Sequence, residues 1–545
     1  MSHGISHAVL VLLCVVPLGL TARTPKMTVV FVIDQLSAHY LEKLKPFLTG
    51  GIPFLLKDGV EYANAFYDAS PPSTGHDHAL LTSGTYGAVH GIINNKWYSN
   101  NSKVKCDEDA SRSARVFAPD GTVYPYGRSA KNMLVDNLSD QLILHSYPHA
   151  HNTVWSLSMK SRASILMAGK LGKAAWFDDT TGNYTSSRAY FEQLPQWIKN
   201  FNKERALSTK KSITWKPFYP LCSPAYNFKD ATNYTFASSE EPLINKTHSL
   251  KGVKGYKKIY ARMPKAHNHF FKLAKACINA NFSGKKSDRF ILWLNISLLD
   301  KVGHVYGPYS REALDAIYHL DHQLLNFIQS VYKKVKQEDA LFILTADHGV
   351  QPIPEIMRER GYMTARRYDA PTLIKQINEM IEKKFGIKGL IHSFAVPQFY
   401  FDQNRLSALD RSTKQKVMDT VKEYLMSLPG IRKAWTFEEL EKTIFEKYDL
   451  DSFIKKLLCR NRSGSLLYST DPYTSLYSKK KGAKHSSPYA YDTKVPLIFY
   501  QAGRFTKKKI ETNRYMTQVS VTLAALLKVP RPSAARANVL PEILP

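Results

Sequence analysis

The chain has 545 residues, of which 44% are hydrophobic and 22% are charged, as expected for a globular protein with a real core. This length allows two to four domains or one large elaborated domain. Lysine and arginine outnumber aspartate and glutamate by 75 to 46, which gives a formal charge of +29. A polyanion-binding protein would have such a charge, but no nucleic-acid motif accompanies it. We therefore interpret the charge as mostly solvated surface, able to steer anionic substrates, and expect no specific nucleic-acid partner.

The N-terminus resembles an export signal. Residues 8–20 read AVLVLLCVVPLGL, which is too short to span a bilayer comfortably and is typical of the apolar part of a signal peptide. Ala22 is a small residue suited to cleavage, so we predict a signal peptide at 1–22 and a mature chain from 23. The segment before the apolar run lacks lysine and arginine, and an uncleaved anchor is the alternative. No other segment is apolar enough to cross a membrane, so we expect a periplasmic or secreted protein without a mature transmembrane span.

The following region, up to about residue 100, has strand, loop and helix character. A hydrophobic run at 29–33 predicts a buried strand, residues 37–58 suit a helix, and 75–83 suit a second helix. Residues of about 100–290 are rich in Tyr, Asn, Ser and Lys and have weak periodicity. We therefore predict an insertion there that forms a cap or side wall.

The second half alternates strands and helices. Strands are predicted at 290–296 and 340–344, and apolar residues repeat every three or four positions between them, over about 311–335. Such an order is typical of a parallel crossover. A second insertion is predicted at about 370–470, with a helix near 371–385, a strand near 393–401 and a helix near 411–427. The core resumes with a strand at 495–500 and a helix at 517–527.

Four cysteines remain outside the signal segment. An even number in an exported chain permits two disulfides with three possible pairings, and free buried thiols are equally compatible. No Cys-x-x-Cys spacing indicates a cysteine metal site. The four are Cys106, Cys222, Cys277 and Cys459.

Aspartate and histidine residues follow the predicted strands. Open α/β sheets place their ligand sites at the C-terminal ends of strands, so we expect these side chains to meet. Oxygen and nitrogen donors without thiolates favour Zn²⁺, Mn²⁺ or a mixed pair. Two ions roughly 4 Å apart would clamp the attacking and leaving oxygens of a phosphoryl transfer. The residues of this candidate bimetallic site are Asp34, Thr74, Asp300, His304, Asp347, His348 and His485.

The threonine of this set has two interpretations. Thr74 lies in the segment PPSTGH, just before the predicted helix at 75–83. A hydroxyl at a helix N-terminus lies where anions are favoured, but Ser and Thr are also the commonest N-caps. Composition alone favours the cap, and it does not separate Ser73 from Thr74.

Six segments, in chain order, carry a further signal: VVFVIDQ, PPSTGHDHALLTSGTYGAVHGIINNKWY, MKSRASILMAG, DKVGHVYGP, TADHG and KKGAKHSSPYAYDTKVPLIF. They resemble the alkaline phosphatase superfamily, and the similarity extends from about residue 27 to 540 in family order. The resemblance is closest to the bacterial alkaline phosphatases with a threonine nucleophile, within the type I phosphodiesterase/nucleotide pyrophosphatase group. It implies an α/β/α sandwich with a central, mostly parallel sheet and inserted cap regions.

The resemblance also implies roles. Thr74 would be the nucleophile, beside one zinc ion held by Asp34, Asp347 and His348. The second zinc ion would be held by Asp300, His304 and His485.

Three further residues would set the substrate preference. Asn95 matches the family asparagine that contacts a phosphoryl oxygen, and Lys160 and Arg162 match the basic pair of the monoesterase branch. A monoester dianion has one more charged oxygen than a diester, so two cations favour it.

Two positions depart from the family pattern. Gly75 stands where alanine is common after the nucleophile, and Asp77 stands where glycine is common before the later histidine. A carboxylate at Asp77 would add negative charge near the site. The helix at 517–527 also lacks the proline commonly found there.

The prediction from the sequence is a zinc-dependent phosphomonoesterase with two zinc ions per chain, acting on small-molecule phosphate esters through a phosphothreonine. The alternative enzyme is a phosphodiesterase or nucleotide pyrophosphatase of the same fold. A non-catalytic polyanion-binding protein is the third hypothesis, and it predicts no stoichiometric metal. The physiological ester and the oligomeric state remain open.

Overall fold

The computed structural model describes residues 23–146, 151–204, 212–227, 241–249, 256–285, 287–446, 449–477 and 481–544. At its centre is a sheet that joins ten strands of these residues in the order β21-β2-β20-β13-β1-β12-β7-β8-β9, with β22 beside β2. The strands are β1 (Met27–Ile33), β2 (Val60–Phe66), β7 (Thr153–Ser158), β8 (Lys173–Phe177), β9 (Tyr184–Thr185), β12 (Phe290–Ile296), β13 (Ala340–Thr345), β20 (Lys494–Tyr500), β21 (Lys508–Ile510) and β22 (Arg514–Tyr515).

The sheet is mostly parallel, as predicted. Strands β13, β1, β12, β7 and β8 run parallel to one another, whereas β20 is antiparallel to β13 and to β2, and β9 is antiparallel to β8. Every residue of β1, β12 and β13 is buried. Helices cover both faces of the sheet, which explains why these strands are nearly continuous apolar runs rather than alternating ones.

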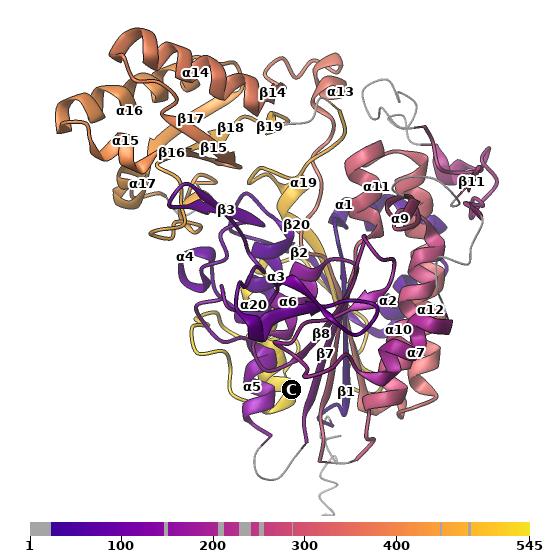
Figure 1. Cartoon of the computed structure of the whole chain (residues 1–545). Coiled ribbons are helices and arrows are strands. Elements are labelled where there is room, and N and C mark those ends of the chain that lie inside the picture. The colour runs from indigo at the N-terminus through magenta and orange to yellow at the C-terminus, as the bar shows by residue number, and fades with distance from the viewer. Residues whose placement is uncertain are drawn as a thin grey trace, which may run out of the picture.

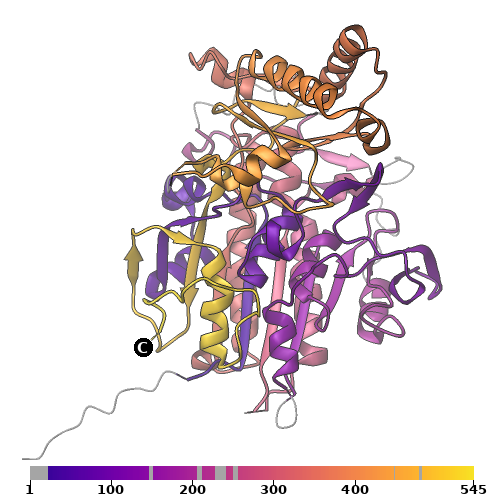
Figure 2. The ribbon, with the colours of Figure 1, turned by 90° about the vertical axis from the view of Figure 1, so that its left-hand side faces the viewer.

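Two helical layers enclose the sheet and confirm the α/β/α architecture (Figures 1 and 2). The amphipathic helix predicted at about 311–335 is α12, and it carries the chain from β12 to β13, which lie on either side of β1. One layer contains α3 (Thr74–Ser83), α5 (Leu138–Leu144), α6 (Ser161–Ala168) and α20 (Thr517–Leu527), and the other contains α2 (Gly51–Asp58), α7 (Gln196–Glu204), α10 (Pro264–Asn281) and α12 (Arg311–Tyr332).

The prediction of a single helix at 37–58 is wrong. The chain forms α1 (Ala38–Leu44), a 3₁₀ turn and then α2, with Pro46 in the turn. At the start of α2, the Asp321 carboxylate accepts hydrogen bonds from the backbone N–H groups of Gly50 and Ile52. A Cβ on Gly50 would lie 2.3 Å from the Asp321 carbonyl oxygen, so the close approach of α12 requires glycine at this break.

The range 100–290 is not one inserted block. It contains β7 and β8 of the central sheet and helices α5, α6 and α10 of its two layers. The serines of β7 (TVWSLS) weaken its apolar pattern, and Ser158 is accommodated because its hydroxyl donates to Asn295 Oδ1. The additional pieces are short strand pairs: β3 (Lys96–Ser99) with β4 (Ser102–Lys105), β5 (Arg115–Phe117) with β6 (Val123–Gly127), and β10 (Ser212–Thr214) with β11 (Thr247–Ser249).

Residues 370–470 form a distinct unit above the sheet edge (Figure 1). They contain helices close to the predicted bounds, α14 (Ala370–Phe385) and α16 (Arg411–Met426), and have a hydrophobic cluster of their own. The predicted strand at 393–401 is a hairpin of two strands. The sheet of this unit has the order β15 (Ile391–Ala395), β16 (Gln398–Phe401), β18 (Leu466–Thr470) and β17 (Ile431–Thr436).

The four cysteines in the described part of the chain are free thiols, with only Cys222 exposed. The signal peptide predicted at 1–22 lies outside the described residues. Among the helices that the structure describes, none has the length and hydropathy needed to cross a bilayer.

Candidate active site

The predicted metal ligands lie at the C-terminal edge of the central strands. Asp34 follows β1 directly, and Asp347 and His348 lie two and three residues after the end of β13. Asp300 and His304 are one turn apart on α11 (Leu298–Tyr306), which follows β12. His485 belongs to the loop before α19 (Ala490–Thr493) and β20.

These six side chains form two groups. Each group offers ligand atoms that lie within 4.8 Å of one another, the arrangement needed to hold one metal ion. The division into two sets is the one that the family resemblance implies. One group is Asp34, Asp347 and His348, and the other is Asp300, His304 and His485.

The histidines of both groups are oriented as metal ligands. Nδ1 of His304, His348 and His485 lies 2.9, 3.0 and 3.0 Å from the carbonyl oxygens of Ala483, Gly349 and Pro72. A carbonyl partner places the proton on Nδ1 and leaves Nε2 as a lone-pair donor, the usual arrangement of ligating histidines. The residues therefore fit a metal pair.

Several ligand atoms of the first group have no hydrogen-bond partner although they are buried. They are Asp34 Oδ1, Asp347 Oδ2 and His348 Nε2. Buried polar atoms are normally satisfied, so three unsatisfied acceptors facing one point indicate a cation site. A divalent ion would satisfy all three at once.

Burial controls the ionisation of the carboxylates. Desolvation raises the pKa of Asp34 to about 6, assisted by Asp300 and Asp347, and it raises the pKa of Asp347 to about 6 as well. Burial also acts on Asp300, but His304 and Lys160 outweigh it and hold the pKa of that carboxyl well below its ordinary value. The site thus concentrates negative charge that is costly without cations.

Lys160 lies between the two groups. Its Nζ is 2.6 Å from Asp34 Oδ2 and 2.5 Å from Asp300 Oδ2, and it donates to Thr74 Oγ1 at 3.3 Å. Burial lowers the pKa of Lys160, but Asp300 and Asp34 outweigh burial, so the net shift is upward and the ammonium form is favoured. One cation therefore contacts a ligand of each group and the threonine hydroxyl.

Thr74 is the first residue of α3, and Ser73 is the residue at the N-cap position. Neither side chain makes a capping hydrogen bond, so the cap interpretation of Thr74 is wrong. Ser73 Oγ is buried without a partner, whereas Thr74 Oγ1 contacts Lys160. This difference favours Thr74 over its neighbour as the residue that takes part in chemistry.

Asn95 is held close to Thr74 by a hydrogen bond to Gly75, the residue that follows Thr74. The backbone N–H of Gly75 donates to Asn95 Oδ1 at 2.7 Å, which fixes the side-chain amide and leaves its NH₂ group as a donor. A Cβ at Gly75 would lie 2.8 Å from Cys106 Sγ. The thiol thus fills the space that an alanine methyl group would need, which explains the glycine.

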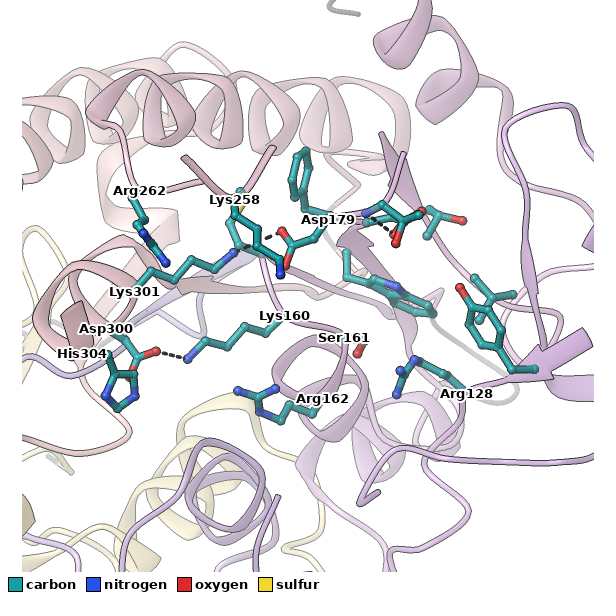
Figure 3. A pocket seen from close by; sticks show the side chains of 18 of the residues that line it. Arg128, Lys160, Ser161, Arg162, Asp179, Lys258, Arg262, Asp300, Lys301 and His304 are labelled. Carbon is teal, nitrogen blue, oxygen red and sulfur yellow. Dashed lines mark hydrogen bonds and ion pairs between the residues drawn. The ribbon is translucent and has the colours of Figure 1, made fainter. Parts of the chain in front are cut away.

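Arg162 is in the first turn of α6, two residues after Lys160. Its Nε is buried without a hydrogen-bond partner. Lys160, Arg162, Asp300 and His304 line the same cavity, which has a volume of about 480 Å³ (Figure 3).

Asp77, which the sequence suggested as an extra negative charge, is buried and hydrogen-bonded to His76 at 2.7 Å. Burial, together with Asp347, raises its pKa well above the ordinary value. The surroundings thus disfavour the charged form of Asp77 relative to a solvent-exposed aspartate.

Two residues that position the candidate ligands, Gln35 and Asn295, were not predicted from the sequence. Gln35 donates from its amide to Asp300 Oδ1 and from its backbone to Asp347 Oδ1, with a left-handed φ of 72°. A Cβ on Gly303 would lie 1.9 Å from Gln35 Oε1, so the glycine between Asp300 and His304 makes room for Gln35. In the sequence, Gln35 stands directly after Asp34 in the segment VIDQ, and Gly303 stands between Asp300 and His304 in the segment DKVGH. Their positions beside candidate ligands are the signal that could have identified them.

Asn295 is a second supporting residue. It is the one amide within the apolar strand β12, and a buried polar residue in such a strand is the signal that could have found it. Its side chain lies 3.0 Å from His78 Nε2 and 3.5 Å from Asp34 Oδ2. It therefore contributes to the orientation of the Asp34 carboxylate, which belongs to the first group.

Comparison with known proteins identifies the family. Residues 28–494 match the family described as type I phosphodiesterase / nucleotide pyrophosphatase. The chain belongs to this family, and the match includes Thr74 and all six Asp and His residues of the two groups.

Individual members are similar in sequence or structure to this protein over nearly its whole length. The chain is 29% identical to alkaline phosphatase PafA of Elizabethkingia meningoseptica, over 95% of this chain and 94% of that protein. It is 28% identical to alkaline phosphatase PhoV of Synechococcus elongatus, over 96% and 94%. The crystal structure of wild-type PafA superposes with a TM-score of 0.85 at 26% identity, covering 96% of this chain and 99% of that one.

The raised pKa values predict how metal binding depends on pH. Asp34 and Asp347 have pKa values of about 6 in the metal-free protein, above the unfolded value of about 3.9. Such carboxylates destabilise the metal-free fold above pH 6, and protonation removes this penalty as the pH falls through 6. Protons also compete with the metal for the same oxygens. The increase in melting temperature on adding zinc should therefore be largest at pH 7–8 and shrink below pH 6.

Scanning calorimetry of chelator-treated and zinc-loaded protein from pH 5 to 8 measures this effect. The Asp34→Asn/Asp347→Asn variant is the control and should show a much smaller zinc effect at every pH. A zinc effect in the wild-type protein that is constant over this range, or largest at pH 5, would contradict the assignment.

The contact between Gly75 and Cys106 gives a separate prediction. Gly75→Ala should destabilise the protein by about 1–3 kcal/mol, the usual cost of overpacking. In a Cys106→Ala background the same change should cost much less, because the thiol that the methyl group meets is gone. Denaturant unfolding of the wild type, both single variants and the double variant measures the coupling. Additive effects would show that the thiol does not restrict this position.

Proposed function

We propose that the protein is a zinc-dependent alkaline phosphatase that hydrolyses phosphate monoesters through a phosphothreonine at Thr74. The observation that carries the proposal is the position of the Thr74 hydroxyl: it lies at the N-terminus of α3 and 3.3 Å from Lys160, which contacts carboxylates of both metal-type groups. The curated relatives named above are alkaline phosphatases, which supports this activity.

Two zinc ions would be held by the two groups of ligands. Asp34, Asp347 and His348 would hold the ion nearer the nucleophile, and Asp300, His304 and His485 would hold the other. When bound, such ions lower the pKa of a hydroxyl and stabilise charge on the attacking and leaving oxygens. The donor set of carboxylates and imidazoles without thiolates suits zinc.

Charge balance supports a pair of divalent ions. Three buried carboxylates and the Lys160 ammonium leave the centre with a net charge of about −2. Two divalent ions would reverse it to about +2, which complements the dianionic phosphoryl group of a monoester.

The reaction would take place in two displacements. The Thr74 hydroxyl gives up its proton to water, and its Oγ1 forms a bond to phosphorus while the bond between phosphorus and the ester oxygen breaks; the leaving alkoxide takes up a proton from water and departs as the alcohol. Water then attacks the phosphothreonine, releases inorganic phosphate and restores the hydroxyl. The Asn95 NH₂ group, held by the Gly75 contact, would donate to a phosphoryl oxygen in both steps.

Lys160 and Arg162 would favour monoesters over diesters. Both line the cavity beside the metal-type groups, and a monoester presents one more charged oxygen to them than a diester does. A solved variant of PafA carries substitutions at a threonine, an asparagine, a lysine and an arginine. Its threonine and asparagine have the same separation along the chain as Thr74 and Asn95, and its lysine and arginine the same separation as Lys160 and Arg162.

A phosphodiesterase or nucleotide pyrophosphatase is the second candidate, since the family bears that description. The proposed location is the periplasm or the exterior, on the basis of the apolar segment at 8–20.

Removal of the nucleophile tests the mechanism. Thr74→Ala should retain the fold and two zinc ions but lose monoesterase turnover by about a thousandfold or more, since the covalent route is gone. Ser73→Ala is the matched control and should keep most of the activity, because its hydroxyl has no partner. Metal analysis and steady-state kinetics on both variants measure this. Normal turnover by Thr74→Ala with an inactive Ser73→Ala would move the nucleophile by one residue.

Removal of the basic pair tests the substrate preference. Lys160→Ala/Arg162→Ala should lower kcat/KM for an aryl phosphate by about a hundredfold, the scale of losing one or two charged donors. The value for the corresponding methyl diester should fall much less, because one of its oxygens is esterified.

Lys160 contacts metal-ligand carboxylates, so zinc content is measured on the same samples. The single variant Arg162→Ala avoids a direct effect on the candidate ligands, because the Arg162 guanidinium forms no ion pair with any described residue. Equal losses on monoester and diester in a fully zinc-loaded Arg162→Ala would contradict the monoesterase assignment.

A further inference from the structure

The cavity beside the candidate site is larger than a phosphoryl group needs. Its volume of about 480 Å³ lies within the range of small-molecule pockets, about 300–1,000 Å³. Asp300, His304, Lys160 and Arg162 line it from the side of the metal-type groups, and its other walls come from β6, β8, α9 (Tyr256–Tyr260) and the segments that follow them (Figure 3). The extra space must accommodate the part of the substrate that leaves.

The far walls of this cavity are basic. Besides Lys160 and Arg162, the side chains of Arg128, Lys258, Arg262 and Lys301 line it, against the carboxylates of Asp178, Asp179 and Asp300. Figure 3 shows Lys258, Arg262 and Lys301 together on one side of the cavity, across from Arg162 and Arg128. The proposed reaction assigns no role to these four additional cations.

Arg128, Arg262 and Lys301 already interact with other groups, whereas Lys258 has no hydrogen bond or ion pair among the residues that the structure describes. Arg128 pairs with Asp107 at 2.5 Å, and Lys301 pairs with Asp179 at 3.4 Å. Lys258 is an exposed residue and makes no ion pair within the described part of the chain. An unpaired ammonium on the wall of a cavity that already has excess positive charge favours a further anion.

Apolar side chains also line the cavity. Met159, Trp176 and Val116 line the cavity and are nearly fully buried. A short organic chain can lie against this apolar surface while charged groups at its two ends contact cations. The walls thus match a molecule that has an anion at each end.

We propose that the cavity is a leaving-group subsite for phosphate monoesters whose alcohol carries a second phosphate, which Lys258 and Arg262 bind. This inference rests on the proposed function, because it takes Thr74 and the metal-type groups as the place where the first phosphate reacts. The second phosphate is a dianion, and ammonium and guanidinium groups are its usual partners.

The experiment compares two pairs of compounds on zinc-loaded protein. Turnover is measured with propyl phosphate and with propane-1,3-diol bisphosphate. Affinity is measured by calorimetry with their non-hydrolysable counterparts, propylphosphonate and propane-1,3-diphosphonate. Wild-type protein should prefer the bisphosphate by about tenfold in kcat/KM and the diphosphonate by about tenfold in Kd, the scale of one charge-assisted contact.

Charge reversal locates the subsite. Lys258→Glu should abolish both preferences, and Arg262→Gln should reduce them. Lys265→Glu is the matched control, since Lys265 is an exposed lysine on α10 that does not line the cavity, and it should retain both preferences. The control also separates a local contact from a general effect of net charge.

The outcomes separate the two proposals. Absence of turnover on both esters, with the diphosphonate still preferred in binding, would overturn the proposed function and keep the anion subsite. Turnover of both esters without a preference in kcat/KM or Kd would overturn the subsite and keep the function. Equal loss of preference in Lys258→Glu and Lys265→Glu would also overturn the subsite.

Discussion

The burial of three carboxylates at one edge of the sheet is the constraint on which the rest of the site depends. Asp34, Asp300 and Asp347 are almost completely buried at the ends of, or just after, strands that have no exposed residues. Each unpaired buried charge costs several kcal/mol. The fold can keep these groups only if cations accompany them, and Lys160 is the only ammonium or guanidinium in the described chain that pairs with any of the three.

The surrounding groups follow from that requirement. The histidine rings present Nε2 because carbonyl oxygens occupy Nδ1, and the side chains of Gln35 and Asn295 contact the carboxylates of Asp300 and Asp34. Gly303 is required because Gln35 passes beside α11. These contacts belong to loops and helix ends supported by the rigid sheet, the arrangement by which a preorganised site is held.

Much of this arrangement was predictable from the sequence because the central strands are buried on both faces. Continuous apolar runs such as Phe290–Ile296 marked the strands, and the Asp and His residues that follow them marked the sheet edge. The 3.6-residue repeat of α12 marked the crossover. Strand β7 was not predicted because its buried serines, Ser156 and Ser158, break the apolar pattern; the Ser158 hydroxyl donates to Asn295 Oδ1 inside the core.

The supporting contacts were less predictable because they join residues far apart in sequence. Nothing local in the chain relates Gly75 to Cys106, or Asp321 to the break before α2. The pKa of Asp77 was not predictable for the same reason, because burial and the nearby Asp347 raise it and neither is visible in the local sequence. Local patterns therefore located the ligands, and tertiary packing determined their orientation and ionisation.

The most direct test of the central claim is anomalous X-ray diffraction at the zinc edge from crystals of the zinc-loaded protein. The account predicts two anomalous peaks, one within ligand distance of Asp34, Asp347 and His348 and the other within ligand distance of Asp300, His304 and His485. It also predicts that the peak at the first group disappears in Asp34→Asn/Asp347→Asn. A catalytically active crystal form with no anomalous peak at either group would contradict the account.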